Sequence, residues 1–327
     1  MNVKALPLLD NISGSISIVG SMNADYTVTA KRLPKPGETI AGGPLRILPG
    51  GKSGNQAAAA ARIGANVNMF GAVGSDANAD FLLGKLNDAG VDTSHVRHAD
   101  GASGTTVITV DDNGENTIVY SAGSNATVST DYIESQKDVL LKSSVLGLCL
   151  ESPIETVTAT AKMCHDAGIK VLLNDSPFTD KLPYELVEYS DILLVNEHEM
   201  AQLLNIAEPK NGDWLGMDWN YIAQTMHDFG FKQAVVTLGG NGAIVIEEDR
   251  TYRVDAAKIE AVDTTGCGDA FMGTLLAGLS SDFSLSDSAS LASYVAAYAA
   301  TSYGAQASYG TSEQIKAFFS KASIPTK

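Results

Sequence analysis

The sequence has few cysteines and no long apolar run, and each shortage excludes a class of protein. Its 327 residues include three cysteines, Cys149, Cys164 and Cys267, with no C-x-x-C pair. A disulfide framework is therefore not expected, and the reducing cytoplasm is the expected location. No run of roughly eighteen apolar residues is present, and the N-terminus lacks a basic segment followed by an apolar one, so we expect neither a membrane span nor export.

Basic residues are also scarce. The chain has 22 Lys and Arg against 38 Asp and Glu, a formal net charge of −16, which argues against nucleic acid or an anionic membrane as the partner. An anionic cosubstrate must then be held by a local positive site or together with a metal ion. The five histidines are scattered, and His95 and His98 have no cysteine or carboxylate cluster beside them, so no zinc site is expected.

Short apolar runs alternate with helical patterns along most of the chain. The expected strands are residues 16–20, 69–73, 145–150, 170–173, 192–195 and 234–238. The expected helices are residues 55–63, 80–89, 155–167, 197–204, 221–229, 270–279 and 286–303. This alternation predicts an α/β fold, a three-layer α/β/α sandwich with a mostly parallel central sheet. Functional groups are then expected at the carboxyl ends of the strands.

Two segments break the alternation. Residues 26–48 contain three prolines, and residues 104–121 have the pattern of a β-hairpin around a turn at 111–114. We expect both to supply strands of a small β-sheet that projects from the main domain as a lid, a dimer contact, or both. Residues 1–14 are expected to be a disordered extension, and residues 15–327 one domain.

The most informative stretch is the glycine-bracketed turn Asp-Thr-Thr-Gly-Cys-Gly-Asp at residues 263–269, just before a predicted helix. Glycines let backbone N–H groups converge, and the start of the helix adds positive potential. Such a turn suits an anion such as a phosphoryl group in transfer. Asp269 has two interpretations: a helix N-cap, or a general base that takes a proton from an attacking hydroxyl.

Polar residues also follow other predicted strands. Asn23 and Asp25 come just after the first strand, where they could hydrogen-bond sugar hydroxyls or form an Asx-turn. Glu151 ends another strand. Asn196 and Glu199 lie one helical turn apart after a third strand; they could hold Mg²⁺ through its waters, or simply begin a helix.

Two glycine-rich loops resemble nucleotide-binding sequences but do not match them. The loop at residues 50–57 is not a Walker A loop, because Arg46 stands where the first glycine is required. Its Lys52 and Asn55 suit a polyhydroxylated ligand or a phosphate, or else an ordinary helix start. The turn at residues 237–242 does not satisfy G-x-G-x-x-G. It could line a nucleotide, or it could be a tight turn into the next strand.

Taken together, in this order and spacing, these stretches resemble the ribokinase-like (pfkB-type) carbohydrate kinases. The matched stretches are GSMNAD (20–25), GGKSGNQA (50–57), LESP (150–153), NEHE (196–199), TLGGNG (237–242), DTTGCGD (263–269) and GAQAS (304–308). They span nearly the whole chain from about residue 16.

The resemblance implies ATP-dependent phosphorylation of D-ribose at its 5-hydroxyl by direct in-line transfer. The alternatives are that the substrate is another sugar or a nucleoside, or that the protein is a non-catalytic sugar sensor. Asp269 is implied to be the base, beside an anion hole of Gly266, Cys267 and Gly268. The residues implied to bind the sugar are Asn23, Asp25, Gly51, Lys52, Asn55, Glu151 and Asp269.

The same resemblance implies sites for ATP, Mg²⁺ and K⁺, and a homodimer formed through the lid. The implied ATP contacts are Asn196, Thr237, Leu238, Gly239, Gly240, Asn241, Gly242, Gly268 and Ser293. Asn196 and Glu199 are implied to organise Mg²⁺. The implied K⁺ ligands, mostly through carbonyl oxygens, are Asp263, Thr265, Ala299, Ser302, Gly304 and Ser308. Cys267 replaces the commoner alanine, and the usual proline before Ser308 is missing.

Overall fold

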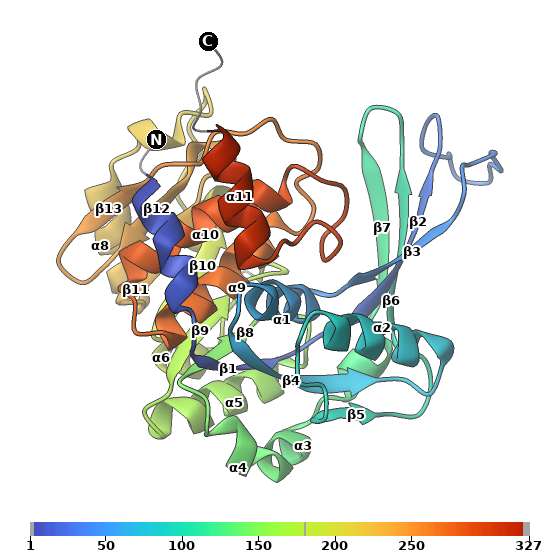
Figure 1. The fold of residues 1–327 in the computed structure, drawn as a ribbon, viewed down its shortest axis with the longest axis horizontal. Coiled ribbons are helices and arrows are strands. Elements are labelled where there is room, and N and C mark those ends of the chain that lie inside the picture. The colour runs from blue at the N-terminus through green and yellow to red at the C-terminus, as the bar shows by residue number, and fades with distance from the viewer. Residues whose placement is uncertain (1–2, 180, 323–327) are drawn as a thin grey trace.

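The structure, a computed structural model, describes residues 3–179 and 181–322, and these form the expected three layers (Figure 1). The strands of the central sheet are β1 (Ser15–Val19), β4 (Asn66–Val73), β5 (Val96–His98), β8 (Val145–Leu148), β9 (Lys170–Asn174), β10 (Ile192–Asn196), β11 (Gln233–Thr237), β12 (Ala243–Ile246) and β13 (Thr251–Val254). Their order across the sheet is β13-β12-β11-β10-β9-β8-β1-β4-β5.

The sheet is parallel from β5 to β11, and the hairpin β12–β13 adds an antiparallel edge. Strand β1 lies near the middle, paired with β4 and β8, and its Ile16, Ile18 and Val19 are fully buried. A strand covered on both faces needs a nearly continuous apolar run, and this is why the runs could be recognised in the sequence.

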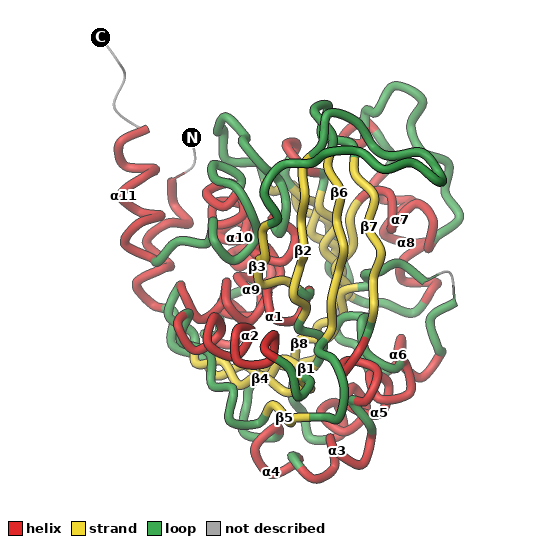
Figure 2. Tube along the Cα trace, turned by 90° about the vertical axis from the view of Figure 1, so that its right-hand side faces the viewer, coloured by secondary structure: helices red, strands yellow, loops and turns green. Residues whose placement is uncertain are grey.

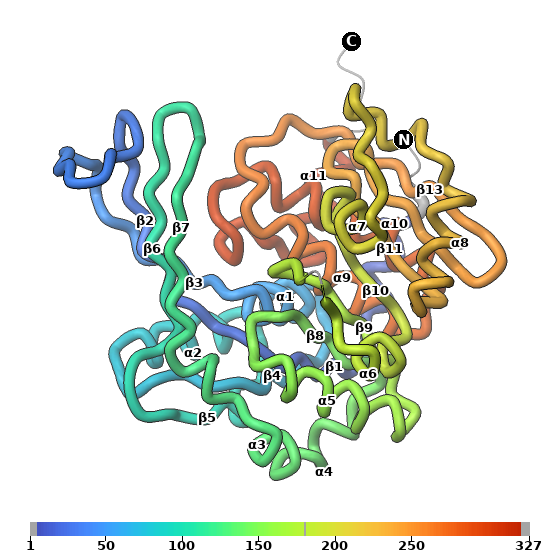
Figure 3. Tube along the Cα trace, turned by 180° about the vertical axis from the view of Figure 1, so that it is seen from behind, coloured from blue at the N-terminus to red at the C-terminus, as the bar shows by residue number. Residues whose placement is uncertain are grey.

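Helices cover both faces of the sheet. One face carries η1 (Val3–Asn11), α1 (Lys52–Arg62), α2 (Ala77–Asp88), α9 (Cys267–Ser280), α10 (Leu285–Ala299) and α11 (Ser312–Ala322). The other face, which can be followed in Figure 3, carries α3 (Thr130–Ser135), α4 (Lys137–Leu140), α5 (Ile154–Asp166), α6 (Tyr184–Glu188), α7 (Glu197–Leu203) and α8 (Trp219–Phe229). Short 3-10 helices are η2 (Gly123–Thr127), η3 (Trp214–Gly216) and η4 (Gly239–Asn241). Within the described part of the chain, no helix has the length and apolar character needed to cross a membrane.

The expectation of a disordered N-terminal extension is wrong for the described part of it. Residues 3–11 form η1, which lies beside α11 (Figure 1). Leu6 and Leu9 are buried against the core, and Asp10 pairs with Lys316 of α11. The apolar residues of this short segment order it by packing, which composition alone does not reveal. Residues 1 and 2 lie outside the described residues.

The helix expected at residues 286–303 ends earlier, because α10 stops at Ala299. Thr301 and Ser302 donate their backbone N–H groups in short turns to the carbonyls of Tyr298 and Ala299. Gly304 then takes a φ of 83°, a left-handed conformation that glycine adopts without strain. The chain after α10 therefore forms a turn at the edge of the candidate site.

A second, four-stranded sheet projects from the main domain beside α1 and α2 (Figure 2). Its strands, in spatial order, are β3 (Arg46–Gly50), β2 (Asn23–Thr29), β6 (Gly104–Val110) and β7 (Asn116–Ser121). The antiparallel pair β6–β7 is the hairpin expected at 104–121. The segment 26–48 contributes strands only at its ends, since its prolines lie in a loop between β2 and β3.

Helices α1 and α9 pack unusually closely at Gly273. A Cβ atom at this position would lie 2.4 Å from the carbonyl oxygen of Gln56 and 3.0 Å from the Cβ of Ala59. The missing side chain lets the two helices approach, and their first turns then meet at the carboxyl edge of the sheet, where Asn55 of α1 reaches Asp269 of α9.

We expect Gly273→Ala to lower the free energy of unfolding by about 1–3 kcal/mol, because the added methyl group overpacks the α1–α9 contact. Gly84→Ala is the matched control, since a Cβ there meets nothing within 4 Å. In the interior of α2 it should raise the free energy of unfolding by about 0.5–1 kcal/mol. Urea unfolding of both variants measures this, and a Gly273→Ala protein as stable as the wild type would contradict the packing argument.

Candidate active site

Polar side chains from several segments meet between the carboxyl edge of the central sheet and the small sheet. Asp269 contributes from the first turn of α9 and Asn55 from the first turn of α1. Glu151 follows β8, and Asn23 and Asp25 lie on β2. The structure thus brings together residues that are far apart in the sequence, as expected for the carboxyl edge of a parallel sheet.

Asp269 does not cap its helix. The N-cap of α9 is Gly266, with φ 75° and no side-chain cap. The Asp269 carboxylate instead accepts hydrogen bonds from α1, with Oδ2 2.9 Å from Asn55 Nδ2 and Oδ1 3.3 Å from Gln56 Nε2. The N-cap interpretation is therefore wrong, and the carboxylate is held at the site by amides of another helix.

Burial shifts the proton affinity of two carboxyls in this site. It raises the pKa of Asp269 to about 6, against the opposing effects of the Lys52 charge and of the bonds from Asn55 and Gln56. It also raises the pKa of Asp25 to about 6, which the bond from Thr106 opposes. A carboxylate with a pKa just below neutral is ionised at pH 7 to 8 and is also a better proton acceptor than an ordinary aspartate.

Asn23 and Asp25 are fixed by partners on neighbouring segments, so the Asx-turn interpretation is wrong. The buried Asn23 accepts a hydrogen bond through Oδ1 from Asn125 Nδ2 at 2.7 Å. The Thr106 hydroxyl of β6 donates to Asp25 Oδ1. These contacts leave the second carboxylate oxygen of Asp25 beside Gly50, where a Cβ would come within 2.0 Å of it.

Lys52 is the first residue of α1, and the Glu151 side chain lies beside it. Glu151 Oε2 accepts hydrogen bonds from the Ser21 hydroxyl and, at 2.9 Å, from the Lys52 backbone N–H. Burial lowers the pKa of the Lys52 side chain, but the charges of Asp269 and Glu151 outweigh it and raise that pKa overall. Lys52 is therefore the positive charge of an otherwise acidic site.

The turn at residues 264–269 presents backbone N–H groups. Cys267 N–H donates to the Thr264 carbonyl at 3.2 Å, and the Ala270 N–H makes the first bond of α9, to the Gly266 carbonyl at 2.9 Å. The N–H groups of Gly268 and Asp269 come before the first hydrogen bond within α9, so they have no acceptor inside the helix. Such N–H groups at a helix start bind anions.

The Cys267 thiol does not have the properties of a reactive group. Burial, and then the charges of Asp263 and Asp269, raise its pKa to about 11. The thiolate is the nucleophilic form, so this side chain reacts slowly near neutral pH. What the position supplies to the turn is its backbone.

Three of the residues implied to bind a monovalent cation are joined by hydrogen bonds. Asp263 Oδ1 accepts from Thr265 N–H and Oδ2 from Gly304 N–H, both at 2.9 Å. Ala299 and Ser302 lie in the adjacent turn, where the Ser302 N–H donates to the Ala299 carbonyl at 3.3 Å. The Ser308 hydroxyl donates to the Ala305 carbonyl at 2.8 Å, so it already has a partner inside its own turn.

A cavity of about 230 Å³ lies beside the anion-binding turn. Of the residues implied to contact ATP, six line it: Thr237, Gly239, Gly240, Gly242, Gly268 and Ser293. Leu238 is buried in the core, and Asn241 lines a neighbouring polar cavity instead. The Ser293 hydroxyl donates to the Asp255 carbonyl. The same turn leads into β12, as the tight-turn interpretation of residues 237–242 expects.

Asn196 and Glu199 form a capping box at the start of α7. Asn196 Oδ1 accepts from the Glu199 N–H, and Glu199 Oε2 accepts from the Asn196 N–H, both at 2.8 Å. The helix-start interpretation is therefore correct. The second oxygen of Glu199 can still accept from a metal-bound water, and among the described residues no group of three or more His, Cys, Asp and Glu side chains is arranged to hold a metal directly. These residues suit Mg²⁺ that keeps its waters.

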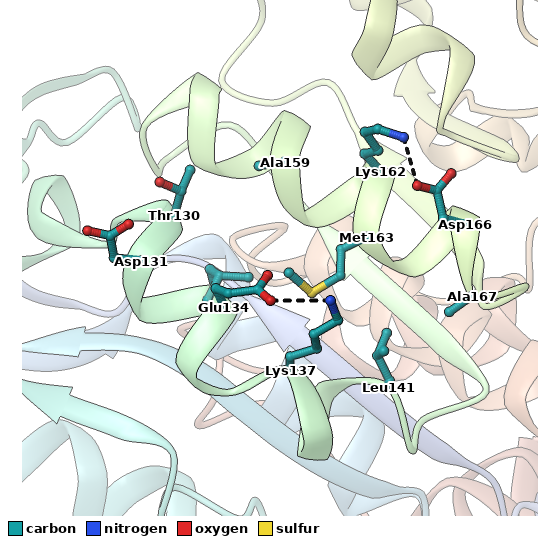
Figure 4. Close-up of a pocket in the computed structure, with 11 residues that line it drawn as sticks. Thr130, Asp131, Glu134, Lys137, Leu141, Ala159, Lys162, Met163, Asp166 and Ala167 are labelled. Carbon is teal, nitrogen blue, oxygen red and sulfur yellow. Dashed lines mark hydrogen bonds and ion pairs between the residues drawn. The ribbon is translucent and has the colours of Figure 1, made fainter.

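A larger surface cavity, of about 530 Å³, lies between α3, α4 and α5 (Figure 4). Four of its charged groups form two ion pairs: Lys137 Nζ lies 3.2 Å from Glu134 Oε1, and Lys162 Nζ lies 2.7 Å from Asp166 Oδ2. None of the candidate site residues lines it, so its size does not identify it as the functional site.

Sequence reasoning missed several residues that orient the site. Gln56 and Gln306 belong to matched stretches, but the resemblance implies no role for them. Thr106 lies on the expected hairpin, and nothing in the sequence marks it as a partner of Asp25. Asn125 is fully buried and binds both the backbone of Met22 and the side chain of Asn23. No local pattern marks a side chain whose partner is about a hundred residues away.

Comparison with known proteins identifies the family of the chain. A model of the pfkB family of carbohydrate kinases matches residues 13–312. A ribokinase of Haemophilus influenzae is 31% identical over 309 residues, which are 94% of this chain and 99% of that protein. A deoxyribokinase of Salmonella typhi is also 31% identical, covering 93% of this chain and 98% of that protein.

Among solved structures, that of Arabidopsis thaliana ribokinase complexed with ribose and ATP has a TM-score of 0.83 and 28% identity, covering 93% of this chain and 98% of that chain. The fold and the family match together define a carbohydrate kinase. The chain belongs to the pfkB family of carbohydrate kinases, and it is an ATP-dependent sugar kinase.

Proposed function

We propose that the enzyme transfers the γ-phosphoryl group of ATP to O5 of D-ribose and releases D-ribose 5-phosphate and ADP. The observation that carries the proposal is the meeting of Asp269 and Asn55 with Lys52, Glu151 and Asp25 at one edge of the sheet. The full-length similarity to proteins named ribokinase supports ribose as the sugar.

The sugar would lie between the small sheet and the start of α1. Carboxylates accept hydrogen bonds from sugar hydroxyls, and amides both donate and accept, so Asp25, Glu151 and Asn23 suit a ligand that carries several hydroxyl groups. Lys52 and Asn55 would donate to sugar oxygens from the first turn of α1, and Gly51 would let the sugar approach the backbone. The small sheet would cover the sugar and exclude water.

Asp269 would act as the general base. Its carboxylate takes the proton of the 5-hydroxyl as that oxygen bonds to the γ-phosphorus, while the bond from the γ-phosphorus to the bridging oxygen of ADP breaks. Transfer is in line, without a covalent enzyme intermediate. The N–H groups at the start of α9, with Gly266, Cys267 and Gly268 in the turn, would stabilise the charge on the phosphoryl oxygens.

The nucleotide would occupy the cavity lined by Thr237, Gly239 and Gly240, with Ser293 near the base. Mg²⁺ bound with the nucleotide would neutralise charge on its phosphates. Asn196 and Glu199 would orient the waters of this ion. Because the chain is acidic, helix N-termini, Lys52 and a metal ion would together balance the charge of its anionic cosubstrate.

A monovalent cation, K⁺, would bind beside the anion-binding turn and support its shape. The Asp263 carboxylate bridges Thr265 and Gly304, and carbonyl oxygens of Ala299 and Ser302 lie in the adjacent turn. The full proposed set also includes Ser308. Such a cation orients the turn without contacting the sugar.

One coupled assay tests substrate and cation together. With ATP and Mg²⁺, ribose is expected to exceed 2-deoxyribose, fructose and nucleosides in kcat/KM by at least about tenfold, because a site that binds a hydroxyl rejects an analogue lacking it. Replacing K⁺ by Na⁺ at fixed ionic strength should lower kcat by about tenfold or more, since a less ordered anion hole stabilises the transition state less. If another compound in the panel were the better substrate, the ribose proposal would be overturned. Equal rates in K⁺ and Na⁺ would overturn the cation proposal.

Asp269→Asn is expected to keep ribose binding, measured by calorimetry, and to lose about 10²–10⁴-fold in kcat, the range for a missing general base. The amide cannot accept the proton of the 5-hydroxyl. A variant within about threefold of the wild type would exclude Asp269 as the base.

We further propose a homodimer formed through the small sheet. Ile47, Val107 and Val119 lie in one cross-strand row with Tyr26, and they are 44%, 54% and 68% exposed. An exposed apolar row across one face of a small sheet is a candidate contact surface for another chain.

Val119→Asp is expected to convert the dimer to a monomer in sedimentation equilibrium, because it places a charge in the apolar row at its most exposed residue. Tyr184→Asp on α6, where Tyr184 is 76% exposed, is the matched control and should leave the dimer intact. A wild-type protein that sediments as a monomer would contradict the proposal.

A further inference from the structure

The turn at residues 304–309 contacts three separate parts of the site. Gly304 N–H donates to Asp263, and the Tyr309 hydroxyl donates to the Gly266 carbonyl at 2.9 Å. Between them, Gln306 is only 5% exposed, and its Nε2 donates to Asn55 Oδ1 at 3.1 Å. Gln306 belongs to a matched stretch of the sequence, but neither the cation ligands nor the sugar contacts described above use its side chain.

We propose that Gln306 is a positioning residue, which holds the Asn55 amide in the one orientation that lets it donate to Asp269. The inference rests on the proposed function, since it assumes that Asp269 is the base. Gln306 itself touches neither sugar nor nucleotide in this arrangement, and it acts through Asn55.

The hydrogen-bonding capacity of each group determines how the Asn55 amide is oriented. An ionised carboxylate accepts and cannot donate, so Asn55 must turn its Nδ2 toward Asp269. Its Oδ1 then points the other way into a buried region, since Asn55 is 7% exposed, and a buried acceptor needs a donor. Gln306 Nε2 is that donor. Without it, the amide can rotate by half a turn and bring Oδ1, a second acceptor, against Asp269.

The direction of the effect follows from the charges around Asp269. Its carboxylate is stabilised by the Lys52 charge and by the donors Asn55 and Gln56, and it is destabilised by burial and by the Glu151 charge. The Asp269 charge in turn contributes to raising the pKa values of Asp25, Cys267 and Tyr309. Loss of the Asn55 donor removes one stabilising contact of the charged form, so the pKa of Asp269 rises.

The test is the pH profile of kcat for Gln306→Met, which keeps the length of the side chain and removes its amide. The acid limb of the profile is expected to move up by about one pH unit, the size of one hydrogen bond to a charged group. The loss in kcat should therefore be large near pH 6 and shrink to about threefold or less near pH 8 and above. Ribose affinity, measured by calorimetry without ATP, shows that the site is folded.

Gln306→Glu is the second variant and keeps the test decisive if the first one fails to fold. The introduced carboxylate, when ionised, can only accept, so it draws Asn55 Nδ2 toward itself and leaves Oδ1 facing Asp269. The acid limb is expected to move at least as far as in Gln306→Met. An acid limb at the wild-type position in either folded variant would overturn the inference.

Tyr309→Phe is the matched control from the same turn. It removes the hydroxyl that binds Gly266 and leaves Gln306, Asn55 and Asp269 in contact, so kcat can fall but the acid limb should stay in place. An equal shift in this control would mean that the turn acts only as a whole, and it would overturn the specific role of Gln306.

Failure of the inference is separable from failure of the proposed function. An inactive Asp269→Asn together with an unshifted Gln306→Met leaves the base in place and removes only the positioning role. An active Asp269→Asn removes the base, and the inference with it.

Discussion

The hydrogen bond from Asn55 to Asp269 joins the first turns of two helices that are 214 residues apart in the chain, and the geometry of the site depends on it. It can form because Gly273 lets α9 lie directly on α1. One contact thereby sets the distance between the glycine loop at the start of α1, which is proposed to hold the sugar, and the turn that is proposed to hold the phosphoryl group. If α9 moved away from α1, both loops could keep their own shapes and still fail to face each other.

Charge is distributed unevenly between the two halves of the site. The chain has a net charge of −16, and carboxylates gather where the sugar is proposed to bind, with Asp25 and Asp269 at pKa values near 6 because burial opposes their ionisation. The proposed phosphoryl site relies on backbone N–H groups at the start of α9. This division is chemically sensible, since neutral hydroxyls bind well to carboxylates while an anion is repelled by them.

The parts that could be predicted from the sequence are those with a local cause. Strands buried on both faces show as apolar runs, and glycine-flanked residues such as Asp269 and Asn55 mark the starts of helices. The order of η1 and the partners of Asn125 and Gln306 depend on contacts made a hundred or more residues away, which no local pattern encodes. Asn196 and Glu199 form the capping box that their spacing predicts, and their proposed role toward Mg²⁺ adds no local pattern of its own.

The turn that carries Gln306 and Tyr309 has a consequence for the order in which the site is made. Gln306 follows its partner Asn55 by 251 residues, and the ribosome supplies the chain from the N-terminus onward. The sugar loop, the small sheet and the turn before α9 can all emerge and begin to fold while the last contacts are still missing. Every strand of both sheets precedes Gln306 in the chain, so the proposed orientation of the Asn55 amide depends on a segment that is synthesised after all of the strands.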